Sequence, residues 1–356
     1  MSANQQGAES PDTLWYTHCP IPTPTSIAWQ RGLFSDEFAA EGIEVKSLWQ
    51  SDRREVRDSH YLHTQPNSFR HGGNLPPLLA RSRGSDVRLL GMTWAGVRNA
   101  ILTLPGSGIA SAEDLRGRRL SVPRRPRAAF DFWHAHVLRT YEGALAAVGL
   151  SLDDVRLVEV VVDEDESGEA LTRSVSLSDT ARRLARRHRE EVIALVAGRI
   201  DVIATEGQTA VTIQDVLGLD VVTDLFDLEN PADRVNNTMP TALTVSGALL
   251  DARPDLVERW LAVVLRAGEW ARDHEREAKR IAALECGIHE DHVERAFSAT
   301  MHEHLGVDLE DASLAALEAQ HDFLLRHRII DTPVDLRSFV VPEVLHAARA
   351  RVPVAG

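Results

Sequence analysis

The sequence predicts an α/β protein with two lobes and a helical C-terminal region. Strand-like and helix-like segments alternate from residue 12, a second α/β run begins after residue 105, and the pattern is nearly all helical from Leu249 onward. Alternation of this kind calls for a mostly parallel sheet with right-handed crossovers. We expect residues 12–104 to form the first part of lobe I, residues 105–226 lobe II, and residues 227–356 the return to lobe I with the C-terminal helices.

The first unit is expected to run strand, helix, strand, helix, strand. Helices are placed where apolar residues recur every three to four positions, and strands where they cluster or alternate with polar residues. The expected elements are a strand at 12–17, a helix at 26–42, a strand at 43–49, a helix at 74–83, and strands at 87–94 and 99–104. Gly42 suits the end of the first helix, and Pro76 and Pro77 suit the first turn of the second.

The second unit starts with a short helix that Ser111 can cap. The further elements are expected at 119–122 (strand), 130–149 (helix), 155–162 (strand), 180–197 (helix), 200–204, 221–225 and 241–245 (strands), and 254–275, 276–285, 290–301 and 313–327 (helices). The acidic run at 163–169 is interpreted as a solvated loop. Two α/β units joined by short crossings leave a cleft, which binds small ligands beyond the carboxyl ends of the strands.

Charge and hydropathy exclude several classes of protein. The formal net charge of −14 argues against a nucleic-acid-binding protein, whose footprint is basic. Two cysteines do not support a disulfide framework. The first ten residues are polar and lack the basic and apolar regions of a secretory signal, and no run of about 18 apolar residues is long enough to span a membrane. We therefore expect a cytoplasmic protein without nucleic-acid or membrane partners.

Two segments carry the residues suited to chemistry. Cys19 follows a strand and lies among three prolines, and it is either a small packed side chain or a reactive thiol. Cys286, at the end of an apolar helical face, is interpreted as a packing residue. The stretch 59–74 has no regular period and holds His60, His63, Arg70 and His71 together with a Gly-Gly pair. Such polar loops commonly carry functional sites.

These residue types fit the handling of a small anion by a thiol. A histidine positions or activates a cysteine, and an arginine fork suits an oxyanion. The N–H groups of Gly72 and Gly73, just before a helix, suit an anion nest. On lobe II, Arg124 is interpreted either as part of an anion clamp or as a residue of a solvated turn. The histidines lack regular metal-ligand spacing, so no metal is expected.

The sequence also resembles the aromatic sulfinate desulfinases, over most of the chain and least across 123–200. The matching positions are Asp12, Thr13, Leu14, Tyr16, Cys19–Pro22, His60, Gln65, Pro66, Arg70, Gly72, Gly73, Pro76–Leu79, Asp114, Leu115, Gly117–Arg119, Ala271–His274 and Phe323–Leu325. The resemblance implies a two-lobed fold of the periplasmic-binding-protein-like type II. It also implies catalytic roles for Cys19, His60 and Arg70 and a backbone contact from Gly73.

This resemblance implies a reaction without metal or organic cofactor. Cys19 would protonate the ring carbon of an arenesulfinate and attack its sulfur, His60 would orient the thiol, and Arg70 would hold the sulfinate. Thr17, His18 and His71 differ from the family pattern, so we expect them, with Gly72, Gly73 and Arg124, among the substrate-binding residues. The substrate would be a small, aromatic anion, and the enzyme a monomer.

Two other functions remain open. One is a non-catalytic solute-binding protein for sulfonates or aromatic acids, since Arg70 and the Gly-Gly turn would capture such ligands equally well. The other is a cysteine enzyme of the same scaffold that acts on another small anion.

Overall fold

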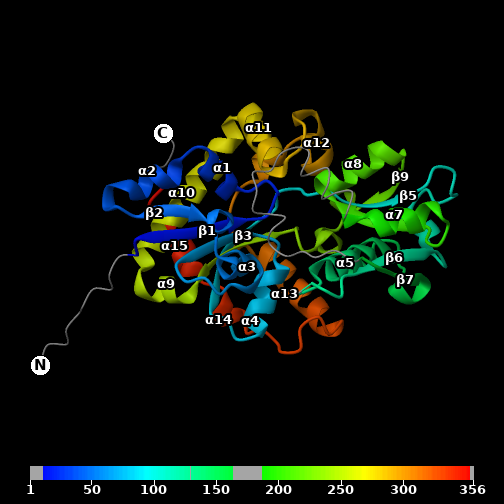
Figure 1. The fold of residues 1–356 in the computed structure, drawn as a ribbon, viewed down its shortest axis with the longest axis horizontal. Helices are drawn as coiled ribbons and strands as arrows, with labels where there is room; N and C mark the ends of the chain where they lie inside the picture. The colour runs from blue at the N-terminus through cyan, green and yellow to red at the C-terminus, as the bar shows by residue number, and fades with distance from the viewer. Residues whose placement is uncertain (1–10, 129, 163–186, 353–356) are drawn as a thin grey trace, which may run out of the picture.

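The computed structural model describes residues 11–128, 130–162 and 187–352, and these form two five-stranded sheets that lie side by side (Figure 1). The acidic run at 163–169 and the first part of the helix expected at 180–197 lie outside the described residues. Within the described residues, no helix is both long enough and apolar enough to cross a bilayer.

The first sheet has the order β2-β1-β3-β10-β4. Its strands are β1 (Thr13–His18), β2 (Glu44–Ser47), β3 (Ser68–Gly72), β4 (Val87–Thr93) and β10 (Thr241–Ser246). β1 pairs in parallel with β2 and β3, whereas β10 runs antiparallel to both β3 and β4. The parallel part places the carboxyl ends of β1 and β3 at one edge.

The second sheet has the order β7-β6-β8-β5-β9. Its strands are β5 (Asn99–Thr103), β6 (Arg119–Arg124), β7 (Arg156–Val161), β8 (Val202–Glu206) and β9 (Asp220–Asp224). β6 is parallel to β7 and β8, and β5 is antiparallel to β8 and β9. Both sheets are therefore mixed rather than mostly parallel, because each contains one strand, β10 or β5, that runs antiparallel to both of its neighbours.

Helices surround both sheets. They are α1 (Pro24–Gln30), α2 (Leu33–Phe38), α3 (Arg54–Leu62), α4 (Leu75–Ser82), α5 (Phe132–Ala146), α7 (Arg189–Val196), α8 (Gly207–Leu217), α9 (Gly247–Ala252), α10 (Pro254–Asp273), α11 (Glu275–Cys286), α12 (Val293–Phe297), α13 (Asp311–Arg326), α14 (Leu336–Phe339) and α15 (Pro342–Ala350). α5, α7 and α8 lie with the second sheet, and α1, α2, α10 and α15 lie with the first (Figure 1).

Several elements differ from their predicted form. The helix expected at 26–42 is broken at Gly32, whose φ of 73° ends α1 and starts α2. α3 lies where the polar stretch was interpreted as irregular, and α8 was not expected at all. The strand at Asn99–Thr103 belongs to the second sheet, so the chain crosses between the sheets before residue 99. The exact lobe boundaries stay a prediction.

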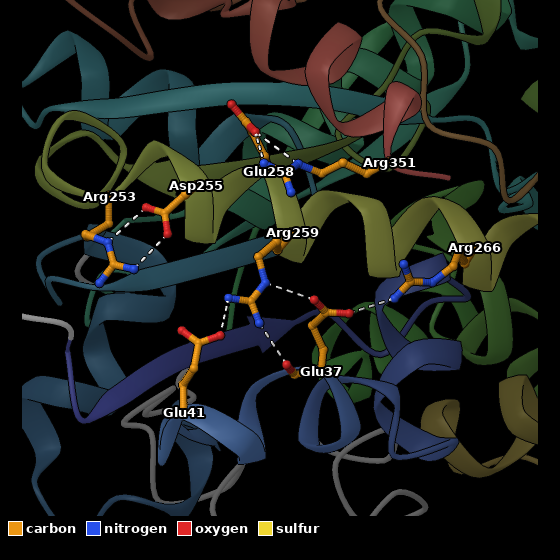
Figure 2. A network of polar contacts seen from close by, with 8 residues as sticks. All are labelled: Glu37, Glu41, Arg253, Asp255, Glu258, Arg259, Arg266 and Arg351. Atoms are coloured by element: carbon orange, nitrogen blue, oxygen red, sulfur yellow. Dashed lines mark hydrogen bonds and ion pairs between the residues drawn. The ribbon is translucent and has the colours of Figure 1, made fainter. Parts of the chain in front are cut away.

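Two helices, α10 and α5, pack against several other elements of the fold. On α10, Trp260 stacks on Phe34 and Phe69, with ring centroids 3.8 Å and 4.1 Å apart, and so joins α2 to the first sheet. At the surface of α10, Arg259 donates hydrogen bonds to the carboxylates of Glu37 and Glu41 (Figure 2). Side chains of α5 enter two separate apolar cores, one of them shared with α4 and α13.

Candidate active site

The candidate active site forms where β1 and β3 end together. In this parallel pair Thr17 lies beside Arg70 and His18 beside His71. Cys19 follows directly, and its backbone N–H donates to the His71 carbonyl (3.1 Å). α3 brings His60 to the same place. Segments that lie 41 and 51 residues from Cys19 in the chain thus converge on its thiol.

The thiol of Cys19 contacts both predicted catalytic partners. Its Sγ lies 3.8 Å from His60 Nε2 and 3.5 Å from Arg70 Nη2. The residue is half-buried, and the next residue, Pro20, is exposed. Gly72 makes this position possible, because a Cβ there would lie 2.4 Å from Cys19 Sγ. Cys19 therefore lies in a confined place with an imidazole and a guanidinium at hand.

His60 is 4% exposed and held from two directions. Its Nδ1 lies 2.7 Å from Thr17 Oγ1, and its ring packs at 4.8 Å on that of Trp49. Burial, followed by the charge of Arg70, lowers the pKa of His60 well below 6.5. At neutral pH the ring is neutral, so one nitrogen accepts and the other donates. The Thr17 hydroxyl serves either tautomer, since it both donates and accepts.

Arg70 is equally enclosed, at 4% exposure. Its Nε donates to the His60 carbonyl (2.9 Å) and its Nη1 to the Gly73 carbonyl (2.8 Å), in addition to the contact with Cys19. Burial lowers the pKa of Arg70 below its ordinary value, yet an arginine in a protein keeps its charge at neutral pH. Three of the five N–H donors thus fix the fork beside the thiol, and two are left for a ligand.

The turn after β3 packs against Asn237, a residue that the sequence did not indicate. A Cβ at Gly73 would lie 2.5 Å from Oδ1 of Asn237, so the Asn237 amide covers this glycine. Asn237 is fixed by the N–H groups of Asn74 and Leu75, at 2.8 Å and 3.1 Å. The adjacent polar pair at 236–237 is a weak signal, and no spacing links it to residue 73.

Three residues predicted to bind substrate have their polar atoms occupied by the protein. Thr17 is 1% exposed and contacts His60. His71 is fully buried between the hydroxyls of Thr25 (2.8 Å) and Thr241 (3.4 Å), and burial lowers its pKa to about 3. His18 contacts the Cys19 carbonyl and Glu285. The polar atoms of Thr17, His18 and His71 thus contact the protein itself, and a role of these residues in substrate binding stays a prediction.

The remaining predicted residues lie elsewhere or pack. Arg124 ends β6 in the second sheet, where it is half-exposed and 3.5 Å from Glu159. The structure does not bring it into contact with Cys19. Cys286 is 2% exposed, and burial raises the pKa of its thiol well above 9. Within the described ranges, no group of three His, Cys, Asp or Glu side chains is arranged to hold a metal ion.

Comparison with known proteins identifies the family. A family model described as "NMT1/THI5 like" matches residues 23–175. The 2′-hydroxybiphenyl-2-sulfinate desulfinase of Rhodococcus erythropolis is 30% identical over 361 aligned positions, which cover 94% of this chain and 93% of the relative. The chain belongs to this desulfinase family.

Solved structures agree with that assignment. The crystal structure of a cysteine-to-serine variant of the desulfinase DszB, in complex with biphenyl-2-sulfinic acid, matches with a TM-score of 0.70 and 27% identity, covering 95% of this chain and 99% of that one. The sulphonate-binding protein SsuA of Escherichia coli matches at TM-score 0.63 with 14% identity, over 93% and 92% of the two chains, and shows the shared fold. The predicted two-lobed α/β fold of the periplasmic-binding-protein-like type, and the membership of the desulfinase family, are confirmed.

Proposed function

We propose that this protein hydrolyses the carbon–sulfur bond of an aromatic sulfinate and releases the arene and sulfite. The observation that carries the proposal is the convergence of His60 and Arg70 on the thiol of Cys19, at 3.8 Å and 3.5 Å, in a member of a desulfinase family. The reaction needs a proton donor, a sulfur nucleophile and a cationic anchor, and these three side chains supply them.

Arg70 is proposed to bind the sulfinate group. Its fork is already oriented by the carbonyls of His60 and Gly73, so little freedom is lost when two oxygens are bound. The N–H of Gly73 adds a donor for the same charge. Burial of the guanidinium strengthens its attraction to an anion, because water does not screen it.

The first chemical step joins the thiol to the sulfur of the substrate. The proton of Cys19 passes to the ring carbon, the carbon–sulfur bond breaks, and Sγ bonds to the departing SO₂ group. The products of this step are the arene and Cys–S–SO₂⁻. Water then adds to the outer sulfur, the S–S bond breaks, and its electrons and a water proton restore the thiol while hydrogen sulfite leaves. Atoms and charge balance, and no cofactor enters.

His60 is proposed to orient and assist these proton movements. As a neutral imidazole it accepts from the thiol or from the attacking water and returns the proton to sulfur. Thr17 permits this exchange because its hydroxyl pairs with Nδ1 in both tautomers. A nearby Arg70 disfavours a lasting imidazolium, so His60 passes the proton on rather than keeping it.

The test is release of sulfite from biphenyl-2-sulfinate by the purified protein. Cys19→Ser should bind the sulfinate and release no sulfite, whereas Arg70→Lys should chiefly weaken binding, since a lysine lacks the bidentate fork. Cys286→Ser is the matched control for thiol chemistry and should retain turnover. A Cys19→Ser variant with unchanged rate would remove the nucleophile from the mechanism.

The same assay distinguishes the other candidate functions. Binding of the sulfinate by the wild-type protein without sulfite release would favour a solute-binding protein. Neither binding nor release would favour an enzyme of this scaffold acting on another anion. The cytoplasmic location, the monomeric state and a contribution of Arg124 to substrate binding stay predictions.

A further inference from the structure

The imidazole of His18 lies between two acceptors. Its Nδ1 is 3.0 Å from the carbonyl oxygen of Cys19, and its Nε2 is 3.0 Å from Oε2 of Glu285. The side chains of both residues are nearly enclosed, at 13% exposure for His18 and 6% for Glu285. A carbonyl oxygen and a carboxylate accept hydrogen bonds but do not donate them.

Only the doubly protonated ring satisfies both of these acceptors. A neutral imidazole carries one N–H, so one of its nitrogens would turn a lone pair toward an oxygen 3.0 Å away. The carboxylate is the stronger acceptor, so the remaining proton would stay on Nε2. The Cys19 carbonyl would then lose its side-chain donor and keep only the N–H of Ile21, at 2.8 Å.

Glu285 holds both elements that flank the cysteine loop. His18 is the last residue of β1, and Gln30, which donates to Glu285 Oε1, is the last residue of α1. The loop with Cys19 joins these two elements. One carboxylate from α11 therefore sets their spacing, and through the Cys19 carbonyl it sets where the thiol points.

We propose that the His18–Glu285 ion pair is a positioning device for Cys19, and that it works only while His18 is an imidazolium. The inference rests on the proposed function for its effect on turnover, but not for its effect on the geometry of Cys19. His18 is a positioning residue, not a catalytic one, because it touches the backbone of Cys19 and leaves the thiol to His60 and Arg70.

The charges around His18 agree with this state. Burial by itself lowers the pKa of His18, but the hydrogen bond and charge of Glu285, with the Cys19 carbonyl, outweigh it and raise the pKa above 6.5. Burial raises the pKa of Glu285, and the bonds from His18 and Gln30 outweigh that effect and lower it. The other titratable or charged neighbours are Tyr16 on β1, His60 on α3, and Arg70 and His71 on β3.

Of these neighbours only Arg70 is charged at neutral pH. Burial raises the pKa of Tyr16 and lowers the pKa values of His60 and His71, so those three stay neutral. Because the pKa of His18 is raised, the His18–Glu285 ion pair is present at neutral pH and is lost as the pH rises through the pKa of His18. Turnover should therefore decline as the pH rises through the pKa of His18.

The first experiment is an NMR titration of the wild-type protein. Cysteine labelled with ¹³C at the carbonyl gives two signals, which the Cys286→Ser variant assigns, and the ring of His18 is assigned with His18→Gln. The expected result is that the carbonyl shift of Cys19 and the ring of His18 titrate together, above pH 6.5. A His18 ring that titrates at or below 6.5, or a Cys19 carbonyl that does not follow it, overturns the proposal.

The second experiment compares Glu285→Gln with Glu277→Gln. Both changes remove one negative charge from α11, but Glu277 is exposed. In Glu285→Gln the buried imidazole has no counter-charge, so we expect the titration of His18 and the alkaline decline in sulfite release to move down by roughly one pH unit or more. We also expect turnover at pH 7 to fall roughly tenfold. Glu277→Gln should match the wild type.

The outcomes separate this proposal from the function on which it rests. If His18 shifts in Glu285→Gln while the alkaline decline stays, the pair is structural only and the positioning role is lost. If the wild-type protein releases no sulfite, the proposed function fails, and the Cys19 carbonyl titration still decides the geometry. If Glu285→Gln does not fold, the wild-type titration and His18→Gln carry the test, because the Cys19 carbonyl of His18→Gln should lose the change that follows the His18 ring.

Discussion

Replacing Gly72 with alanine tests the packing of the reactive thiol directly. The new Cβ would lie 2.4 Å from Sγ, 3.1 Å from Cβ and 3.3 Å from N of Cys19. Ordinary contacts begin near 3.4 Å, so Sγ must move by at least 1.0 Å (3.4 minus 2.4) to accept the methyl group. The thiol is the part of Cys19 that moves most easily, and its shift changes the distances to His60 and Arg70.

A shift of this size should lower turnover strongly while the fold survives. Misplacement of a reacting group by 1 Å costs about a hundredfold in rate, which corresponds to about 2.7 kcal/mol of barrier. Overpacking of this kind destabilises a protein by roughly 1–3 kcal/mol. The assay is sulfite release from biphenyl-2-sulfinate at saturating substrate, with thermal unfolding measured on the same samples.

Gly306→Ala is the matched control. At Gly306 an added Cβ would meet only Nη2 of Arg272, at 3.4 Å, which is an ordinary contact. This variant should keep the wild-type rate. A folded Gly72→Ala variant that retains a third or more of the wild-type rate would refute the assignment of Cys19 Sγ as the reacting atom, or its position against β3.

Three further predictions concern the surroundings of the site and the stability of the fold. Thr17→Val removes the partner of His60 Nδ1 at 2.7 Å and should lower sulfite release roughly tenfold, whereas Thr17→Ser should stay near wild type. His71 has a pKa of about 3 in the folded state, so the free energy of unfolding should fall, by up to about 1.4 kcal/mol per pH unit, as the pH drops below 6.5. Urea titrations at pH 5, 6 and 7 should show a weaker dependence of the unfolding free energy on pH for His71→Asn than for the wild type. An equal dependence would contradict the burial argument. Arg259→Ala removes the ion pairs to Glu37 and Glu41 (Figure 2) and should lower the free energy of unfolding, measured with urea, by about 1 kcal/mol at low salt and by less in 1 M NaCl. A loss of stability that does not depend on salt would instead indicate the packing of Arg259 on Phe38.

Much of the fold was predictable because its signals are local. Strand and helix periodicity located β1, β4, β6, α5, α10 and α13 to within a few residues. It was harder to predict which sheet a strand joins. The composition of Asn99–Thr103 suits either sheet, and its partners β8 and β9 come much later in the chain. α3 was missed because its nine residues carry mostly polar side chains, and only packing shows which face is buried.

The residues of the candidate site could likewise be predicted in part. The proline-rich segment after β1 and the polar stretch before α4 marked Cys19, His60, Arg70 and the Gly-Gly pair by composition and by family resemblance. The roles of the neighbouring residues depend on the direction in which each side chain points. Thr17 and His71 point to the protein interior and His18 points to Glu285, and no one-dimensional pattern distinguishes these directions from one that faces a ligand.

The sequence by itself determined the chemical repertoire: two cysteines of which one lies in a proline-rich loop, a histidine and an arginine suited to a thiol and an anion, and the family in which these occur together. The tertiary structure alone decided which atoms meet. Contacts such as those of Glu285 with His18, or of Asn237 with Gly73, join residues far apart in the chain. Their geometry follows from how helices pack on a sheet, and that packing is a property of the whole chain and not of any local segment.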